Sequence, residues 1–235
     1  MFFKKCLIFF ISFGLYASSV VTLSPAQEGR KIWGISRAPS GASPLGYNMV
    51  NLMTREKVEA IFIKYLRTDT DMSQKKRIQL AKELSKKLMV LAGKHRFSPA
   101  FILSIIQAES TFHMDARSKV GAIGLMQLMP ATAGYISKKW KIRRYQGAAS
   151  LYDPVLNMEM GVTYLAYLRD RYNDDARTFL TAYNAGPTLV DRFLKAEREL
   201  DQIRESRKYI ESISAKVAGF CGDLSPSMVG PMESC

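Results

Sequence analysis

Repeated helix-start signals constrain the fold of this 235-residue chain more than any other feature. Ser98-Pro99 and Asp153-Pro154 each place proline at the first position of a helical pattern, directly after a side chain that can cap the helix. Between such signals apolar residues recur every three to four positions, as at Ile102, Ile105 and Ile106. No segment of any length alternates apolar and polar residues as a half-buried strand does. We therefore predict a mainly α fold.

Helical patterns continue on both sides of this central part. Thr54 can cap a helix that carries Val58 and Phe62 on one face, and Ser73 can cap a longer helix. Stretches rich in glycine, proline and serine mark the expected linkers and ends. The sequence is therefore divided into a linker or arm (27–53), N-terminal helices that pack on the main domain (54–94), the main domain (95–218) and a C-terminal tail (219–235).

The N-terminus has the pattern of a secretory signal peptide over residues 1–26. Lys4 and Lys5 precede an apolar run, and small residues follow, so that cleavage after Ser19 and cleavage after Ala26 both stay open. The apolar run is shorter than the ~20 residues of a membrane-spanning helix, although an uncleaved anchor is the alternative. We expect export to the periplasm or cell envelope, with membrane contact only through this segment if it is retained.

The chain is basic, with a formal net charge of +13 and a pI near 9.7. Such a charge favours an anionic partner such as a nucleic acid, a membrane surface or an acidic wall polymer, but it can also serve solubility alone. The basic runs, such as Lys75-Lys76-Arg77, lie in helical stretches without interleaved aromatic residues or a recognisable nucleic-acid-binding module. We read them as solvated helix faces and expect no nucleic-acid partner.

Two cysteines remain once the leader, which contains Cys6, is removed. Cys221 and Cys235 would both enter an oxidising compartment, where a pair of cysteines is a candidate disulfide. Geometry decides whether two thiols can bridge, so a disulfide and two free thiols are equally open at this point.

Glu109 is the candidate catalytic residue. It stands near the end of the apolar helix that carries Ile105 and Ile106, and a carboxyl group among apolar neighbours has a raised pKa. Such a group can donate a proton near neutral pH, although a solvent-facing residue at a helix end would fit the same position. His95 and His113 are too few for a zinc site, and neither a serine-hydrolase elbow nor a phosphate-binding loop is present. We therefore expect no metal and no cofactor.

Five ordered segments of the main domain carry the strongest functional signal. They are Ile106–Phe112, Ser118–Ala133, Leu151–Pro154 with Asn157 and Gly161, Ala182–Pro187, and Glu205–Ile210. Together they resemble the motifs of the soluble lytic transglycosylase family, with Ser206 where threonine is more usual. The resemblance covers roughly residues 95–215. It implies a lysozyme-like (goose-type) α domain with a small loop or β element, preceded by the N-terminal helices.

The resemblance also assigns the site. Glu109 would be the catalytic residue of a murein lytic transglycosylase, a glycosidic-bond lyase acting on peptidoglycan. The residues expected to bind the glycan strand are Ser118, Met126, Gln127, Tyr183, Asn184, Glu205 and Tyr209. Met126 is also of a type that more often packs in a core than touches a substrate.

The sequence offers no second carboxylate for the usual glycosidase pair. Asp115 has no assigned role in the family, and Asp153 fits a helix cap. The resemblance implies that one carboxyl group protonates the MurNAc–GlcNAc oxygen and then accepts the proton of the MurNAc C6 hydroxyl, leaving a 1,6-anhydro end. A lysozyme-like hydrolase and a non-catalytic wall-binding component of a secretion or conjugation machine are the alternatives. Cleavage within strands or from their ends, and general turnover or local wall opening, all stay open.

Overall fold

The computed structural model describes residues 53–222, which belong to one unit spanning Pro39–Cys235. The predicted signal peptide, the linker up to residue 52, the tail beyond Gly222 and Cys235 of the candidate disulfide lie outside the described residues. In the part of the chain that the structure describes, no helix has both the length and the apolar character needed to cross a membrane.

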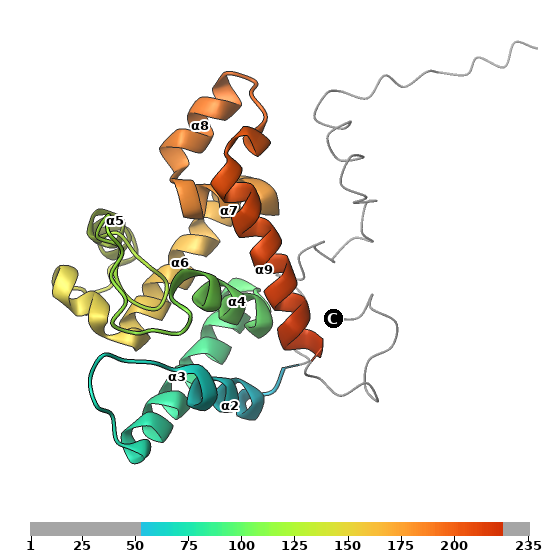
Figure 1. The fold of residues 1–235 in the computed structure, drawn as a ribbon. Helices are drawn as coiled ribbons and strands as arrows, with labels where there is room; N and C mark the ends of the chain where they lie inside the picture. The colour runs from blue at the N-terminus through green and yellow to red at the C-terminus, as the bar shows by residue number, and fades with distance from the viewer. Residues whose placement is uncertain (1–52, 223–235) are drawn as a thin grey trace, which may run out of the picture. The chain divides into compact units, whose positions relative to one another are not determined.

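The described residues form eight α-helices and two short 3-10 helices (Figure 1). The α-helices are α2 (Arg55–Tyr65), α3 (Gln74–His95), α4 (Pro99–Ser110), α5 (Pro130–Trp140), α6 (Pro154–Arg171), α7 (Ala176–Ala185), α8 (Pro187–Lys195) and α9 (Arg204–Gly222), and the 3-10 helices are η1 (Ala148–Tyr152) and η2 (Leu200–Gln202). Between residues 53 and 222 the extended pairing is limited to isolated bridges, two of which join Ile123 to Arg117 and Leu128. The predicted mainly α fold is confirmed.

The helix starts follow the expected capping chemistry. The Ser98 hydroxyl accepts a hydrogen bond from the Phe101 amide at 3.1 Å at the start of α4. At the start of α6, one oxygen of Asp153 accepts from the amides of Val155 and Leu156 at 2.9 and 3.1 Å. These bonds satisfy N–H groups that have no partner inside the helix. The predicted caps at Ser98 and Asp153 are therefore confirmed.

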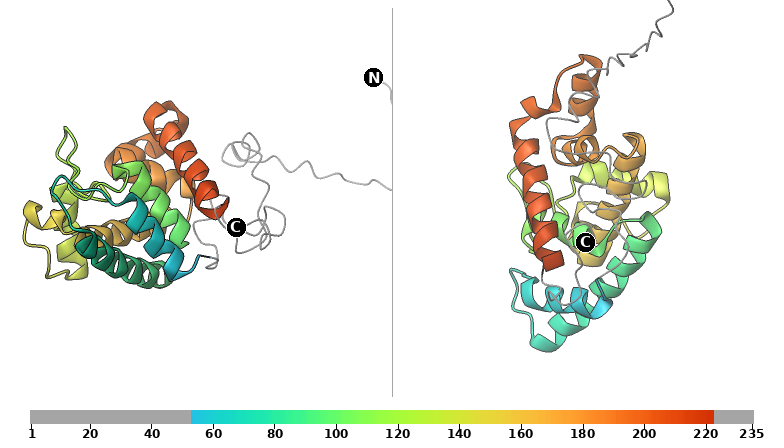
Figure 2. Two further views of the ribbon diagram at one scale, coloured as in Figure 1. Left: turned by 60° about the horizontal axis from the view of Figure 1, so that its bottom comes forward. Right: turned by 90° about the vertical axis from the view of Figure 1, so that its right-hand side faces the viewer.

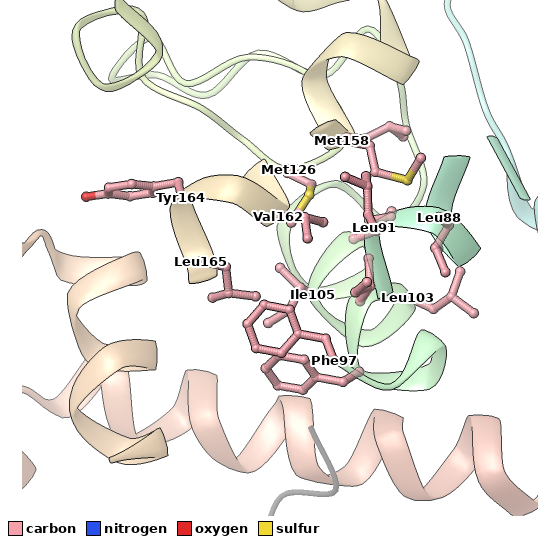
Figure 3. Packing of buried hydrophobic residues seen from close by; sticks show 14 of the residues in the cluster. Leu88, Leu91, Phe97, Leu103, Ile105, Met126, Met158, Val162, Tyr164 and Leu165 are labelled. Atoms are coloured by element: carbon pink, nitrogen blue, oxygen red, sulfur yellow. The ribbon is translucent and has the colours of Figure 1, made fainter. Parts of the chain in front are cut away.

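Helix α4 lies in the centre of the core. Its side chains Phe101 to Ile106 are buried, which is typical of a helix that is apolar on every face. It packs against α3 and α9, while α6 packs against α3 and α7 (Figures 1 and 2). Figure 3 shows Leu103 and Ile105 of α4 among side chains from α3 and α6. The end of α4, where Glu109 lies, is thereby held by helices from distant parts of the sequence.

The N-terminal helices contact the segment that follows α4. Arg67, just after α2, donates its amide to the Phe112 carbonyl and accepts from the Met114 amide, both at 2.9 Å. The Phe112 ring packs against the rings of Phe62 and Tyr65, with centroids 6.0 and 5.8 Å away. The helices before α4 therefore brace the turn directly beyond the candidate catalytic residue.

Candidate active site

Glu109 lies in the last turn of α4, and its side chain is partly buried. Removal of the carboxyl group from water raises its pKa from 4.5 to about 7, because a low-dielectric surrounding disfavours the charged form. The helix ends one residue later, and Thr111 at its end has a left-handed backbone with φ of 50°. The apolar helix thus presents, at its end, a carboxyl group that can hold a proton near neutral pH.

Tyr209 of α9 contacts Glu109 directly. Its hydroxyl donates a hydrogen bond to Glu109 Oε1 at 2.5 Å, and this bond lowers the pKa of Glu109 against the larger effect of burial. Burial and the negative charge of Glu109 raise the pKa of Tyr209 well above its usual value, so the phenol stays a donor. The packing of α4 on α9 fixes this pair.

Tyr183 of α7 lies near the same carboxyl group but holds the neighbouring loop. Burial and the charge of Glu109 raise the pKa of Tyr183 well above its usual value. Its hydroxyl donates to the Met126 carbonyl at 2.9 Å. Tyr183 therefore joins α7 to the loop between α4 and α5, beside the carboxyl group of Glu109.

That loop is held by polar contacts along its length. The Ser110 hydroxyl donates to the Leu125 carbonyl at 2.9 Å, next to Glu109 in sequence. The Gln127 side-chain amide donates to the carbonyls of Ala116 and Gly124 at 3.1 and 2.9 Å. Ser118 Oγ accepts from the Ala122 amide at 3.0 Å. In this structure the side chains of Gln127 and Ser118 therefore hold the backbone of the loop in place.

Asn157 of α6 is the central anchor of the loop. Its amide nitrogen donates to the Ile123 and Leu151 carbonyls at 2.8 and 2.9 Å, and its oxygen accepts from the Met126 amide at 2.8 Å. Asn157 is fully buried. Gly124, with φ of 80°, lies so close that a Cβ there would stand 2.3 Å from Asn157 Nδ2. The sequence motif contained Asn157, but no local signal showed that it joins three segments.

Met126 was expected to bind substrate, and the structure places its side chain in the core. The side chain is fully buried among the core side chains (Figure 3). It lies against Gly161 of α6, where an added Cβ would be 2.7 Å from Met126 Cβ. Its backbone is held on both sides, by Asn157 and by Tyr183. Met126 thus positions the loop through its backbone and fills the core with its side chain.

Replacing Gly161 with alanine is expected to lower the free energy of unfolding by about 2 kcal/mol, because the new methyl group overpacks against Met126. Displacement of Met126 also disturbs its bond to Tyr183, so the glycan cleavage expected from the resemblance falls too. Gly134→Ala in α5 is the matched control, since no atom lies within 4 Å of its added Cβ. Urea unfolding that showed equal stabilities for the two variants would contradict this packing argument.

The remaining candidate residues lie at the start of α9 and the end of α7. Asn184 is exposed, and its amide donates to the buried Ser206 Oγ at 3.3 Å. Glu205 is exposed one residue earlier. The structure therefore brings Glu109 together with Tyr183 and Tyr209. Asn184 and Glu205 lie at the surface, and their contacts with substrate stay predictions.

Two other carboxylates considered as partners for Glu109 are engaged elsewhere. Asp115 accepts hydrogen bonds from the Thr68 hydroxyl and, at 2.9 Å, from the Asp69 amide, and so ties the segment after α2 to the turn after α4. Asp153 caps α6 and also pairs with Arg144 at 2.6 Å. Both have structural partners that account for their positions.

One group of side chains in the described residues has the composition of a metal site. Asp69, His113 and Asp115 each offer a ligand atom, and these atoms lie within 4.8 Å of one another. His113 Nε2 already pairs with Asp69 Oδ1 at 2.9 Å, and Asp115 accepts from Thr68 and from the Asp69 amide. Protein donors and acceptors account for this cluster without an ion.

Removal of the Tyr209 hydroxyl by substitution with phenylalanine is expected to move the alkaline limb of the pH profile upward by about one pH unit. The hydroxyl lowers the pKa of Glu109, so its loss leaves Glu109 protonated to higher pH. The profile of kcat/KM for the expected glycan cleavage measures this shift. Tyr183→Phe is the control, because that hydroxyl bonds the Met126 carbonyl rather than Glu109. A downward shift in Tyr209→Phe would contradict the assigned hydrogen bond.

A family model described as the transglycosylase SLT domain matches residues 89–205. The chain is 32% identical over 127 residues to the soluble lytic murein transglycosylase of Salmonella typhimurium, covering 50% of this chain and 20% of that protein. It is 31% identical over 182 residues to the membrane-bound lytic murein transglycosylase C of Mannheimia succiniciproducens, covering 73% of this chain and 49% of that protein. The chain thus spans at most about half the length of these two curated relatives.

Solved structures show the same fold. The lytic transglycosylase Slt of Pseudomonas aeruginosa, solved as an inactive mutant, matches with a TM-score of 0.53 and 30% identity over 63% of this chain and 27% of its own. The 70 kDa soluble lytic transglycosylase of Escherichia coli matches with a TM-score of 0.52 and 26% identity over 68% of this chain and 29% of its own. Residues 89–205 of this chain therefore match the transglycosylase SLT domain family in sequence, and the chain shares its fold with solved lytic transglycosylases.

Proposed function

We propose that this protein is a lytic transglycosylase that cleaves the MurNAc–GlcNAc bonds of peptidoglycan glycan strands, with Glu109 as acid and then as base. The observation that carries the proposal is the buried carboxyl group of Glu109, whose pKa is raised to about 7 and which accepts a hydrogen bond from Tyr209. A carboxylic acid that keeps its proton near neutral pH is the group that protonation of a glycosidic oxygen requires.

In the first step Glu109 donates its proton to the glycosidic oxygen, the bond from this oxygen to the anomeric carbon of MurNAc breaks, and GlcNAc leaves as an alcohol. Glu109 becomes a carboxylate, and the Tyr209 hydroxyl then donates to an anion instead of a neutral acid. Hydrogen bonds to charged groups are stronger than those to neutral groups, so Tyr209 stabilises the state that follows proton transfer.

In the second step the MurNAc C6 hydroxyl attacks its own anomeric carbon and gives its proton to Glu109. The product is a 1,6-anhydro ring, the acid form of Glu109 is restored, and no water is consumed. A hydroxyl on the same sugar has a large advantage in effective concentration over water. The acetamido oxygen of MurNAc can stabilise the positive charge that develops at the anomeric carbon. It thereby takes the role that a second carboxylate has in other glycosidases.

The remaining site residues fit the walls of a strand-binding site. We assign Ser118, Gln127, Asn184 and Glu205 to contacts with the sugars, with Tyr183 and Met126 holding the loop beside Glu109. The predicted signal peptide supports export of this activity to the periplasm or cell envelope. There it serves wall remodelling or local wall opening for a secretion or conjugation apparatus.

Digestion of purified peptidoglycan tests the proposal. The protein is expected to release soluble muropeptides whose MurNAc ends are one water lighter in mass than those released by a hydrolase. Glu109→Gln is expected to release them roughly 10³-fold more slowly or not at all. Hydrated reducing ends would make the protein a muramidase, and binding of sacculi without released fragments would make it a wall-binding component.

A further inference from the structure

A continuous series of aromatic rings leads from the catalytic site to the surface. The ring of Tyr183 lies 5.7 Å from that of Tyr164, and Tyr164 lies 6.2 Å from Tyr167, both on α6. Tyr167 in turn contacts Trp140 and Tyr135 of α5, with centroids 5.5 and 5.8 Å away. Figure 3 shows the Tyr164 side chain projecting from α6, apart from the other labelled side chains. The series therefore connects the neighbourhood of Glu109 with the outer face of α5 and α6.

The outer end of this series forms a cationic aromatic surface, which we call the platform and define as Tyr135, Lys139, Trp140 and Tyr167. Tyr135 and Trp140 are 45% and 36% exposed. The Lys139 ammonium lies 4.0 Å from the Tyr167 ring centre, 4.9 Å from that of Trp140 and 5.5 Å from that of Tyr135. It also donates to the Tyr135 hydroxyl at 3.1 Å. These contacts fix one positive charge among three rings.

The packing of α5 does not require the two outer rings. Ala133 and Ile136 are the buried residues of α5, whereas Tyr135 and Trp140 keep more than a third of their surface exposed to solvent. Covering the faces of large aromatic side chains lowers the free energy, so an exposed group of them is typical of a binding surface. The sequence of α5 has two lysines in its last turn and no acidic residue, which favours an anionic occupant.

A glycan strand fits this chemistry. The faces of pyranose rings are lined by C–H groups and pack on aromatic rings, while the edges carry polar groups. MurNAc also carries carboxylates, either on its lactyl group in peptide-free strands or on the attached stem peptide. The platform is joined to the catalytic site by the ring series and by α5 itself, which starts at Pro130, just beyond the loop held by Tyr183.

We propose that the platform is an outer binding site for the glycan strand that is cleaved at Glu109, with sugar rings on Tyr135 and Trp140 and a strand carboxylate on Lys139. This inference rests on the proposed function and adds a site some distance from the bond that is broken. It gives the protein a preference for long, acid-bearing strands over short fragments.

Binding measured in the Glu109→Gln background tests the platform without cleavage. The probes are a neutral GlcNAc oligomer, peptide-free glycan strands and intact sacculi. Tyr135→Ala combined with Trp140→Ala is expected to weaken binding of all three probes by about tenfold. Lys139→Gln is expected to weaken binding of the acidic probes alone, by roughly threefold to tenfold. An effect on peptide-free strands identifies the lactyl carboxylate, and an effect on sacculi alone identifies the stem peptide.

Two matched surface variants serve as controls, Tyr152→Ala for an exposed ring outside the series and Lys138→Gln for an exposed lysine of α5. Unchanged binding in the double variant, with unchanged circular dichroism, would overturn the platform. Equal effects of Lys138→Gln and Lys139→Gln would overturn the specific role of Lys139. Cleavage by the unsubstituted protein is measured separately. Failure of the proposed function therefore shows as absent cleavage, and failure of the platform shows as intact cleavage with unaltered binding.

Discussion

Replacing Glu109 with glutamine is expected to reduce glycan cleavage by roughly 10³-fold or more, because in the proposed mechanism this one side chain supplies both proton transfers. Glutamine has nearly the same shape and still accepts from the Tyr209 hydroxyl, but it cannot donate a proton to the glycosidic oxygen. The initial rate of muropeptide release from purified peptidoglycan measures the loss. Residual activity within tenfold of the unsubstituted protein would show that another group acts as the acid.

The same substitution is expected to stabilise the protein at alkaline pH. The pKa of Glu109 is about 7 in the folded chain and 4.5 in the unfolded reference, so the folded state holds the proton more tightly. Well below pH 4.5 the carboxyl group is protonated in both states, so its ionisation does not change the free energy of unfolding. Between pH 4.5 and 7 the unfolded state loses its proton while the folded state keeps it, so the free energy of unfolding falls with rising pH. Above pH 7 the loss is complete at up to about 3 kcal/mol, and Glu109→Gln removes it. Urea unfolding at pH 8 and at pH 4 measures the difference.

A stabilisation that is equal at both pH values would contradict the raised pKa of Glu109. A stabilisation that is present at pH 8 and absent at pH 4, together with lost cleavage, would show that the folded chain keeps a destabilising group for its chemistry.

Substitution of Asn157 by leucine is expected to lower the free energy of unfolding by about 3–4 kcal/mol and the melting temperature by on the order of 10 °C. The change leaves the Met126 amide and the Leu151 carbonyl without their buried partner, whereas the Ile123 carbonyl still accepts from the Leu128 amide. The loop beside Glu109 loses its anchor to α6, so cleavage is expected to fall further than stability alone explains.

Thr163→Val is the matched control on the same helix. Thr163 is also buried, but its hydroxyl donates to the Glu159 carbonyl within the helix, so its loss leaves no loop unanchored. We expect a change of about 1 kcal/mol or less. Thermal unfolding that ranked Thr163→Val as the more damaging variant would contradict the role assigned to Asn157.

The local parts of this fold were predictable from the sequence. Ser98 and Asp153 act on amides two or three residues away, so their capping role depends on neighbours that the sequence itself specifies. The buried character of α4 was likewise visible in its run of apolar residues. The identity of Glu109 as the candidate acid came from the ordered motifs, since burial of a single carboxyl group cannot be read from an apolar helix alone.

The contacts between distant segments were not predictable in detail. Tyr209 lies 100 positions from Glu109 in the sequence, yet its hydroxyl makes the direct hydrogen bond to the Glu109 carboxyl group. Met126 was expected to bind the substrate, but its side chain is buried in the core, where Gly161 leaves room for it. The platform joins Tyr135 and Trp140 to Tyr167 of another helix, and no spacing within either segment signals that meeting.

The most direct test of the central claim is the fate of water during cleavage. Peptidoglycan is digested in water enriched in heavy oxygen, and the MurNAc ends of the products are weighed. If Glu109 accepts the proton of the attacking C6 hydroxyl, the products are expected to have anhydro ends. These ends are one water lighter than hydrated ends and contain no heavy oxygen. Hydrated MurNAc ends that carry one heavy oxygen atom would contradict the account, because they would show that water attacks the anomeric carbon.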